Sequence, residues 1–394
     1  MRKPAIWKAR QILVKKLKAR VTSDSARRSL VNLETKYEMA RNIAALAVPS
    51  LITPSPKFLT IAITAKCNLR CEGCLYGRGY MNGSELPTEM VLSVLRDAAA
   101  AGMSTVRLYG GEPLLHTGLP DMIRECVALG LSPFVTTNGI ILKRRLDAIV
   151  DAGLRTIEFG YYGHGEEYDS YVGKKGAWNR FEAAVADTRD RYGSELRLRM
   201  SYVLNTRTCS VAELRKAWEF AIRYDLSFKV DLVHYSLPYF TEGPNRELQF
   251  KPADVEQINQ VVAELAILNR ERPDLYKEPH ASIRSIPDWL LRGADMRVPC
   301  DAYNMIWVGA DGSVRLCYVT FPMGNLFDKP LREMLFTASH KSACISANQL
   351  ACPNCHCSRD TRIEKHLPSL LHYSVGQTKP LPPVDKPGPF VMVR

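Results

Sequence analysis

The sequence predicts an α/β protein built on a partial six-fold βα barrel, and three observations support this. From residue 57 onward, apolar segments of strand length alternate six times with amphipathic segments of helix length. Three cysteines follow the first apolar segment within eight residues, and a second cysteine-rich region begins at Cys300. We therefore expect a barrel, a small cysteine-rich C-terminal domain and, before both, a helical leader.

The leader, residues 1–52, is strongly basic. Its first fifty residues hold twelve Lys or Arg and three Asp or Glu, so most of the net charge of +12 lies there. Residues 6–21, "IWKARQILVKKLKARV", predict a basic amphipathic helix, which could pack its apolar stripe on the main body or meet an anionic membrane surface. We rank the membrane above nucleic acid, because no nucleic-acid motif occurs, and we expect no nucleic-acid partner. Residues 48–56, "VPSLITPSP", read as a linker.

The cellular setting follows from what the sequence lacks. It has no uncharged apolar run of about 18 residues, which a membrane span would need. The basic start is not followed by the apolar core and cleavage site of a signal peptide. We expect a cytoplasmic protein, with the inner face of the membrane as the surface that the leader would contact. In the cytoplasm, clustered cysteines are metal ligands more often than disulfides.

The barrel is expected over residues 53–245. Its strands are predicted at 57–65, 105–110, 132–139, 154–163, 195–205 and 227–235. Its helices are predicted at 87–102, 118–130, 141–152, 175–191 and 211–225. Connecting helices (246–299, including 252–270), the cysteine-rich domain (300–372) and a Pro-rich tail (373–394) complete the chain. In such folds, ligands bind at the C-terminal ends of the strands.

The stretch "CNLRCEGC" places Cys67, Cys71 and Cys74 on the loop after the first strand. Zinc sites usually take four ligands in two separated pairs, whereas this loop offers three. Three thiolates suit a 4Fe–4S cluster that is held at three irons. The fourth iron would then be open to a substrate or cofactor.

This C-x3-C-x2-C motif resembles the signature of the radical S-adenosylmethionine superfamily. "YGGEP" at the end of the second strand and "TNG" (137–139) at the end of the third resemble further family landmarks. The resemblance implies that Gly110, Gly111, Glu112 and Pro113 contact the methionine amino group. Glycine permits close backbone approach, and a carboxylate accepts from an ammonium group. Asn205, at the end of the fifth strand, corresponds to a polar position that relatives use on the ribose.

Two departures from the family pattern stand out. Gly73 occupies the position before the third cysteine, where relatives often have an aromatic residue near the adenine, and Tyr76 or Tyr80 could substitute for it. In the fourth strand, Gly160 replaces a serine that can contact ribose, and Tyr162 replaces an aspartate. The resemblance therefore leaves open whether the fourth strand binds the ribose.

The resemblance also implies a reaction. A reduced cluster gives one electron to S-adenosylmethionine, the C–S bond breaks, and the resulting 5′-deoxyadenosyl radical takes a hydrogen atom from substrate. Such an enzyme needs a reducing partner such as a flavodoxin or ferredoxin.

The second cysteine region resembles the auxiliary-cluster domains called SPASM and Twitch. Six cysteines from Cys300 onward are too few for two extra clusters, so we expect one auxiliary 4Fe–4S cluster, which would transfer electrons. The predicted ligands are Cys300, Cys317, Cys352 and Cys355. Cys357 and Cys344 are rivals for these places, and a zinc ion on the same four ligands is the alternative. Cys126 and Cys209 are expected to be ordinary thiols.

Three functions remain open from the sequence. The first is a redox or rearranging enzyme for a small or lipid-linked molecule, suggested by the single auxiliary cluster and the absence of a recognisable peptide-docking domain. The second is a peptide-modifying maturase of the SPASM type, and the third a non-catalytic iron–sulfur or zinc scaffold. No residue is assigned as catalytic. The strand ends offer Tyr161, Tyr162, His234 and Tyr235, each of which more often packs than reacts.

Overall fold

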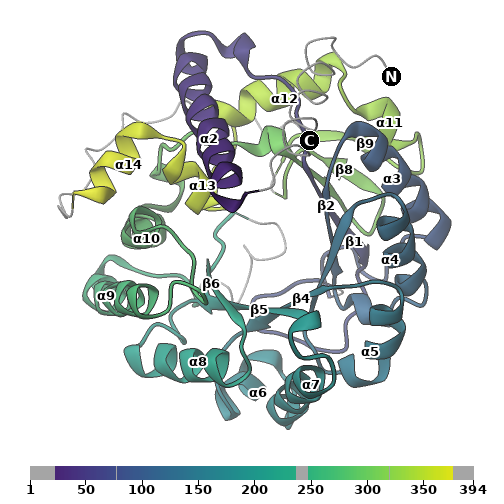
Figure 1. Ribbon diagram of the computed structural model, residues 1–394, viewed down its shortest axis with the longest axis vertical. Helices are drawn as coiled ribbons and strands as arrows, with labels where there is room; N and C mark the ends of the chain where they lie inside the picture. Colours follow the sequence, from purple (N-terminus) through teal and green to yellow (C-terminus); the bar gives the residue numbers. More distant parts are fainter. Residues whose placement is uncertain (1–22, 77, 237–246, 319, 376–394) are drawn as a thin grey trace.

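A nine-stranded sheet, curved into part of a barrel, organises the chain (Figure 1). The computed structural model describes residues 23–76, 78–236, 247–318 and 320–375. The strand order is β6-β5-β4-β3-β2-β1-β7-β8-β9, parallel from β6 through β7 and antiparallel from there to β9. The strands are β1 (Phe58–Thr64), β2 (Thr105–Gly110), β3 (Ser132–Thr137), β4 (Thr156–Tyr161), β5 (Arg197–Leu204), β6 (Ser227–Leu232), β7 (Met305–Val308), β8 (Ser313–Arg315) and β9 (Pro322–Asn325).

The predicted alternation of strands and helices is confirmed. Helices follow the barrel strands in chain order and lie outside the sheet in Figure 1. They are α3 (Thr88–Ala101), α4 (Leu119–Ala128), α5 (Leu142–Asp151), α6 (Glu166–Val172), α7 (Ala177–Tyr192), α8 (Val211–Arg223), α9 (Val255–Glu271) and α10 (His280–Arg292). The C-terminal region adds α11 (Leu331–Met334), α12 (Ala338–Asn348), α13 (Arg359–Glu364) and α14 (Leu367–Ser374).

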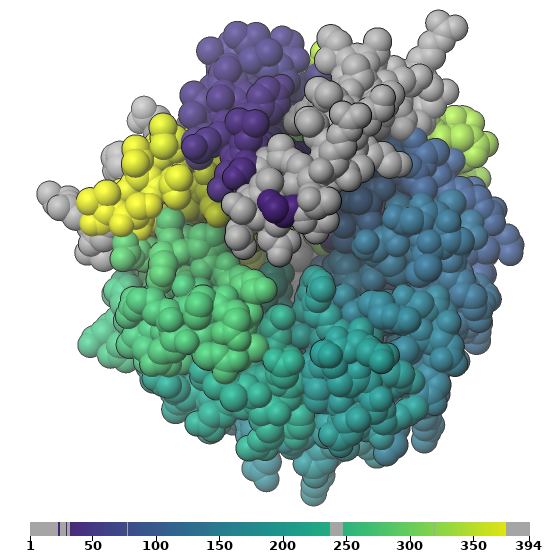
Figure 2. All heavy atoms as spheres, in the orientation of Figure 1, coloured from purple at the N-terminus to yellow at the C-terminus, as the bar shows by residue number. Residues whose placement is uncertain are grey.

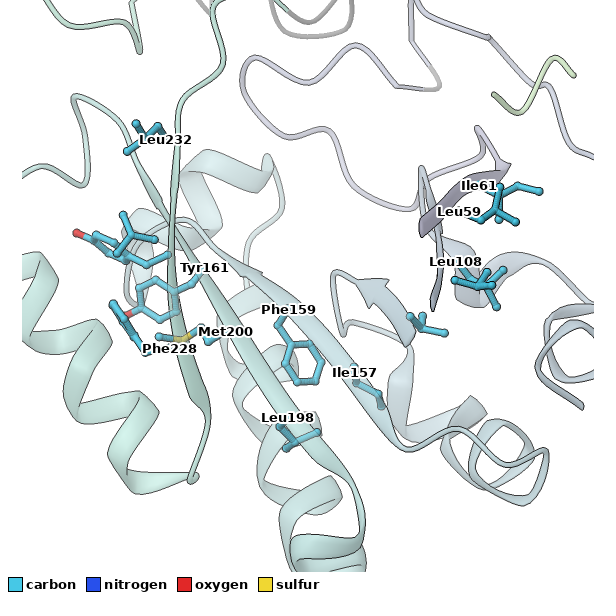
Figure 3. Packing of buried hydrophobic residues seen from close by; sticks show 14 of the residues in the cluster. Leu59, Ile61, Leu108, Ile157, Phe159, Tyr161, Leu198, Met200, Phe228 and Leu232 are labelled. Carbon is cyan, nitrogen blue, oxygen red and sulfur yellow. The ribbon is translucent and has the colours of Figure 1, made fainter. Parts of the chain in front are cut away.

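Each barrel strand buries one face against the helices. Alternate residues of β4 and β5, such as Ile157, Phe159 and Leu198, are fully buried and belong to one apolar core. Figure 3 shows Phe159, Met200 and Phe228 packed between the sheet and the surrounding helices. Because successive side chains of a strand point to opposite faces, the residues between them line the inner face of the sheet. That inner face carries the polar residues discussed below.

The cysteine-rich region is joined to the barrel through the sheet itself. Strand β7 pairs in parallel with β1, with Phe58 opposite Met305 and Ile61 opposite Val308. The β8–β9 hairpin then extends the sheet. Cys300 and Cys317 flank β7 and β8, so this pairing carries them to the barrel wall. The domain boundaries stay predictions.

A long N-terminal helix, α2 (Asp24–Ala47), packs on this C-terminal region. The buried carboxylate of Glu38 pairs with Lys365 at 2.9 Å and with Lys57 at 3.1 Å. Figure 2 shows α2 in purple on the same face of the molecule as α14 in yellow. The predicted amphipathic helix at 6–21 lies outside the described residues, as does most of the Pro-rich tail. Among the described helices, none combines the length and apolar character that crossing a bilayer requires.

The segment 48–56, expected as a linker, is packed against the body. Ile52 is buried, and Ser55 donates its backbone N–H to the carbonyl of Tyr303 at 3.1 Å. Proline and serine made this stretch look like an exposed connection, yet Ile52, Pro54, Ser55 and Pro56 are all buried. The connection between the leader helix and β1 is therefore a buried, hydrogen-bonded one.

Candidate active site at the C-terminal edge of the sheet

The cysteine loop after β1 is held by backbone and arginine hydrogen bonds. Arg70 and Glu72 donate their backbone N–H groups to the last carbonyls of α6, at 3.1 and 2.7 Å. The guanidinium of Arg78 donates to the carbonyls of Cys71 and Cys74, at 2.7 and 2.9 Å. Together these contacts fix the direction of the loop that carries the three thiols.

Gly73 has a structural reason to stand where relatives have an aromatic residue. Its φ is +73°, in the left-handed region that favours glycine over any residue with a Cβ. The aromatic side chains nearby come instead from Tyr76 and Tyr80, whose rings meet edge to face at 5.4 Å. Tyr76 packs in a buried cluster that Cys74 also joins, so it lies beside the loop, and its role near the adenine stays a prediction.

The three thiols lie close enough to interact electrostatically. Burial raises the pKa of each, to about 11 for Cys74, and neighbouring thiols raise it further in Cys71 and Cys74. For Cys67, the backbone N–H groups of Leu69 and Asn68 oppose this effect, because they stabilise the thiolate. Iron binding would have to displace the thiol protons, and these N–H groups would then point at ligated sulfur.

Within the described ranges, no three His, Cys, Asp or Glu side chains lie in an arrangement that would hold a metal ion. The ligand sets at both cysteine regions therefore stay predictions.

Gly110 and Gly111 are required by the cysteine loop itself. A Cβ on Gly110 would lie 2.1 Å from the carbonyl oxygen of Thr64, and one on Gly111 would lie 2.4 Å from that of Lys66. The backbone N–H groups of Gly111 and Glu112 donate to these same two carbonyls, both at 2.8 Å. The backbone of the GGEP segment is thus hydrogen-bonded to the backbone of residues 64–66, directly before Cys67. The close approach that these glycines allow is therefore between two backbone segments of this chain.

Glu112 is buried between the ends of β2 and β3. Its carboxylate accepts from the hydroxyl of Thr137 at 2.7 Å and from the backbone N–H groups of Leu114 and Asn138 at 2.9 and 2.8 Å. Burial raises its pKa to about 7, against the opposing effect of these donors. A carboxylate has about four acceptor positions, so these three donors leave about one acceptor position open.

Two asparagines offer buried donors beside this edge. Asn205 is fully buried, and its Oδ1 accepts from the backbone N–H groups of Arg207 and Thr208, at 2.8 and 3.2 Å. Its Nδ2 has no hydrogen-bond partner among the described residues, and neither has the Nδ2 of Asn68, next to Cys67. A buried donor without a partner is costly, so both atoms fit a polar ligand that completes the site.

Tyr162 fills the space that Gly160 leaves open. A Cβ on Gly160 would lie 2.3 Å from the hydroxyl oxygen of Tyr162, so the two departures noted in the fourth strand depend on each other. The Tyr162 ring stacks on Tyr171 with centroids 4.6 Å apart. Burial raises its pKa, and the thiols of Cys71 and Cys74 raise it further, so the phenol lies near the cysteine loop.

Among the C-terminal cysteines, the thiols of all but Cys344 interact with one another. The thiols of Cys300, Cys317 and Cys355 all act on Cys357, whose pKa is raised by its hydrogen bond to Cys355 and by burial. Cys352 interacts with Cys355. Cys344 is fully buried on α12, and burial alone raises its pKa to about 12. Cys357 thus lies near the predicted ligands and Cys344 does not interact with them, while the choice of Cys352, Cys355 or Cys357 stays a prediction.

Two residues near these thiols were not assigned a role from sequence. The guanidinium of Arg362 donates to the carbonyls of Cys355 and Val298, and lies 4.8 Å from the centre of the Trp289 ring. His356 lies in the C-x2-C-x-C stretch, and its ring is 4.1 Å from that of His234. His234 in turn brings its Nε2 to 3.2 Å from the sulfur of Cys357. An isolated arginine or histidine gives no sequence signal of such contacts.

Arg207 was also missed, although it directly follows Asn205 in the loop after β5. Its guanidinium pairs with Glu72 between the first-cluster cysteines, and reaches Glu167 and Ser170 of α6 at 3.0 Å each. One side chain therefore ties the β5 loop, the cysteine loop and α6 together. Only the fold brings these three segments to one place.

Parts of this sequence are similar to known proteins. A model of the radical SAM superfamily matches residues 61–206. The GTP 3′,8-cyclase of Moorella thermoacetica is 35% identical over 138 residues, which are 33% of this chain and 43% of that protein. The corresponding enzyme of Chlorobaculum tepidum is 38% identical over 99 residues, 25% of this chain and 30% of that one. The chain thus spans less than half the length of these curated relatives.

Solved structures extend the likeness over most of the chain. Streptococcus suis SuiB bound to S-adenosylmethionine has a TM-score of 0.58 at 18% identity, covering 86% of this chain and 78% of that one. The structure of anSMEcpe with bound AdoMet has a TM-score of 0.58 at 16% identity, covering 81% and 92%. At these identities, the likeness concerns the fold.

Proposed function

We propose, from the premise that residues 61–206 form a radical SAM domain, that this chain is an enzyme that abstracts a hydrogen atom from a small substrate. The family binds a 4Fe–4S cluster and S-adenosylmethionine, and together these supply a 5′-deoxyadenosyl radical when bound. The supporting observation is the convergence, at one edge of the sheet, of the three-thiol loop, the GGEP segment and two buried asparagine donors without partners.

The residues have distinct proposed roles. Cys67, Cys71 and Cys74 would hold three irons and leave the fourth open. The backbone of Gly110 and Gly111, with the remaining acceptor position of Glu112, would orient the methionine end, and Asn205 Nδ2 would donate to the ribose. Tyr162, stacked on Tyr171, would close the wall beside the radical and exclude water.

We further propose an auxiliary 4Fe–4S cluster in the C-terminal region. Cys300, Cys317 and Cys355 are three of its ligands, and either Cys352 or Cys357 is the fourth. Four thiolates would leave no open iron, so this cluster would transfer electrons and would not bind substrate. A reducing partner such as a flavodoxin or ferredoxin would supply electrons to the first cluster.

The experiment is product analysis under anaerobic conditions. With a strong reductant and S-adenosylmethionine, the reconstituted protein should form 5′-deoxyadenosine and methionine even without substrate. Cys71→Ala should abolish both products, because the cluster loses a thiolate, whereas Cys126→Ala, at a buried thiol in α4, should leave them unchanged. Undiminished product from Cys71→Ala would refute radical chemistry at this loop.

A peptide maturase is the second candidate. The structural likeness to SuiB, solved with its precursor peptide SuiA, and to anSMEcpe, solved with peptides, favours it.

A further inference from the structure

Arg362 of α13 is a deeply buried cation. Its side chain is 1% exposed, and a guanidinium is always charged in proteins. It donates to the carbonyls of Cys355 and Val298 and, at 3.2 Å, to Oδ1 of Asn354, and its carbon lies 4.8 Å from the centre of the Trp289 ring. Its Nε has no hydrogen-bond partner among the described residues. All these contacts are with neutral groups.

Carboxylates that reach α13 from other elements are bound to other cations. Asp301 pairs with Lys365 at 2.8 Å, and Glu278 pairs with Arg359. Within the described part of the chain, Arg362 itself makes no ion pair. A buried charge that is surrounded only by neutral dipoles and a ring is costly, because it has lost its water and gained no counter-ion. The position of Arg362 therefore calls for an anion beside it.

The C-terminal cysteines are the groups that can supply this anion. Burial raises the pKa of the Cys300 and Cys352 thiols, and the Arg362 cation opposes the rise in both. The pKa of Cys355 is lowered, first by its hydrogen bond with Cys357 and then by Arg362, against the effect of burial. Arg362 thus interacts with three of the thiols, and its charge is matched once their sulfurs are deprotonated.

A second donor, His234, meets the sulfur of Cys357. Its Nε2 lies 3.2 Å from this sulfur, whereas its Nδ1 has no hydrogen-bond partner among the described residues. A sulfur that binds a metal carries no proton, so Nε2 would carry the proton and donate it. The backbone around His234 is held in place. Gln249 donates to the carbonyl of His234 at 2.8 Å, and the ring of His356 lies 3.0 Å from the carbonyl of Val233.

We propose that Arg362 and His234 raise the reduction potential of the auxiliary cluster, and that Cys357 is its fourth ligand. One-electron reduction adds a negative charge to the site, so a buried cation beside the thiolates stabilises the reduced form. A hydrogen bond to a ligating sulfur acts in the same direction, because it withdraws electron density from that sulfur. Both side chains are positioning residues that act through the cluster. This proposal rests on the auxiliary cluster of the proposed function.

The test is a redox titration monitored by electron paramagnetic resonance. It uses the full-length chain with Cys67, Cys71 and Cys74 changed to Ala, so that only the auxiliary cluster is present. Arg362→Met should lower the ratio of reduced to oxidised cluster about tenfold at a fixed potential, a shift of about 59 mV for one electron. Arg362→Lys keeps the charge and should restore part of this shift, whereas Arg362→Gln, which keeps only the N–H donors, should not. His234→Leu should also lower the ratio, and His234→Gln, which keeps an N–H group, should restore part of it.

The matched control is Arg284→Met. Arg284 also donates to two backbone carbonyls of the C-terminal region, those of Tyr373 and Ser374, at 3.2 and 2.8 Å. Its removal should leave the potential unchanged. Iron content is measured in every variant, and if Arg362→Met does not retain its iron, the difference between Arg362→Lys and Arg362→Gln decides.

The outcomes separate this proposal from the proposed function. Unchanged potentials in the Arg362 and His234 variants, with iron retained, would overturn the proposal and leave the auxiliary cluster standing. Loss of the cluster in Cys352→Ala but not in Cys357→Ala would overturn the choice of Cys357 as ligand. A protein without Cys67, Cys71 and Cys74 that holds zinc, or no iron, would overturn the auxiliary cluster itself.

Discussion

Gly111 shows at the scale of one residue why the GGEP motif is tied to the cysteine loop. We predict that Gly111→Ala lowers the free energy of unfolding by about 2–3 kcal/mol, because the new methyl group collides with the carbonyls of Ala65 and Lys66. Iron content after reconstitution should fall as well, since these carbonyls lie directly before Cys67. Urea denaturation and iron analysis are the measurements.

Gly79→Ala is the control for this substitution. Gly79 lies in the same loop region, with no atom within 4 Å of its added Cβ. Its iron content should equal that of the wild type. A tolerated Gly111→Ala substitution would mean that the two backbones are not held as closely as the structure has them.

The raised pKa of Glu112 predicts that the stability of the protein falls as pH rises. Burial raises its pKa from 4.5 to about 7, so the folded protein takes up a proton at a pH where the unfolded chain does not. The stability that this group provides is complete below about pH 4.5 and falls by about 3 kcal/mol as pH rises through 7. Glu112→Gln does not titrate, so wild type should lose stability relative to this variant between pH 5 and pH 8. Parallel pH profiles for the two proteins would contradict the raised pKa.

At the scale of elements, Arg207 joins a strand loop, the cysteine loop and a helix. We predict that Arg207→Ala loosens the cysteine loop, because Glu72 and α6 lose their common partner. The visible absorption of the reconstituted cluster should then bleach faster in air than that of the wild type, while Arg207→Lys should restore part of the resistance. The control is Arg191→Ala, which removes an ion pair between α7 and Asp147 of α5. Equal bleaching rates would refute a role for Arg207 in holding the loop.

The docking of α2 on the C-terminal region depends on Glu38. Burial alone would raise its pKa, but the ammonium groups of Lys365 and Lys57 lower it to about 2. A lowered carboxyl pKa contributes stability above the unfolded value of about 4.5, and this contribution is lost as pH falls towards 2. Glu38→Gln should therefore cost about 2–3 kcal/mol at pH 7, with the deficit shrinking between pH 5 and pH 3. Unfolding curves of the two proteins would show the same stability deficit at every pH if the lysines did not lower the pKa of Glu38.

The sequence predicted the barrel elements well, because each helix and strand has its own periodicity and its own turn residues. It also predicted that Cys67, Gly110 and Asn205 lie at one edge of the sheet, because the C-terminal ends of parallel strands meet there. It could not anticipate contacts between distant segments, such as Arg207 with Glu72 or Cys357 with His234. The charged pairs on the inner face of the sheet, such as Arg107 with Glu158, were missed for a related reason. Alternating charges in a strand look like a solvated face until the sheet curves and encloses them.

For the whole molecule, the arrangement suggests two cysteine sites joined by one sheet. Strand β1 leads to the first loop, and its neighbour β7 leads through β8 to Cys317. At the opposite edge of the sheet, His234 directly follows β6 and brings its Nε2 to 3.2 Å from the sulfur of Cys357 in the second cysteine region. Under the proposed function, this layout would serve a hydrogen abstraction followed by electron transfer to the proposed auxiliary cluster.

The most direct test of the open-iron cluster is a spectroscopic one. A variant with Cys300, Cys317, Cys352, Cys355 and Cys357 all changed to Ala removes every candidate auxiliary ligand among the clustered thiols. After anaerobic reconstitution it should hold about four irons, and the electron paramagnetic resonance signal of the reduced cluster should change when S-adenosylmethionine is added. A protein with about four irons whose signal is indifferent to S-adenosylmethionine, or one that holds no iron, would contradict a cluster held at three irons by the loop after β1.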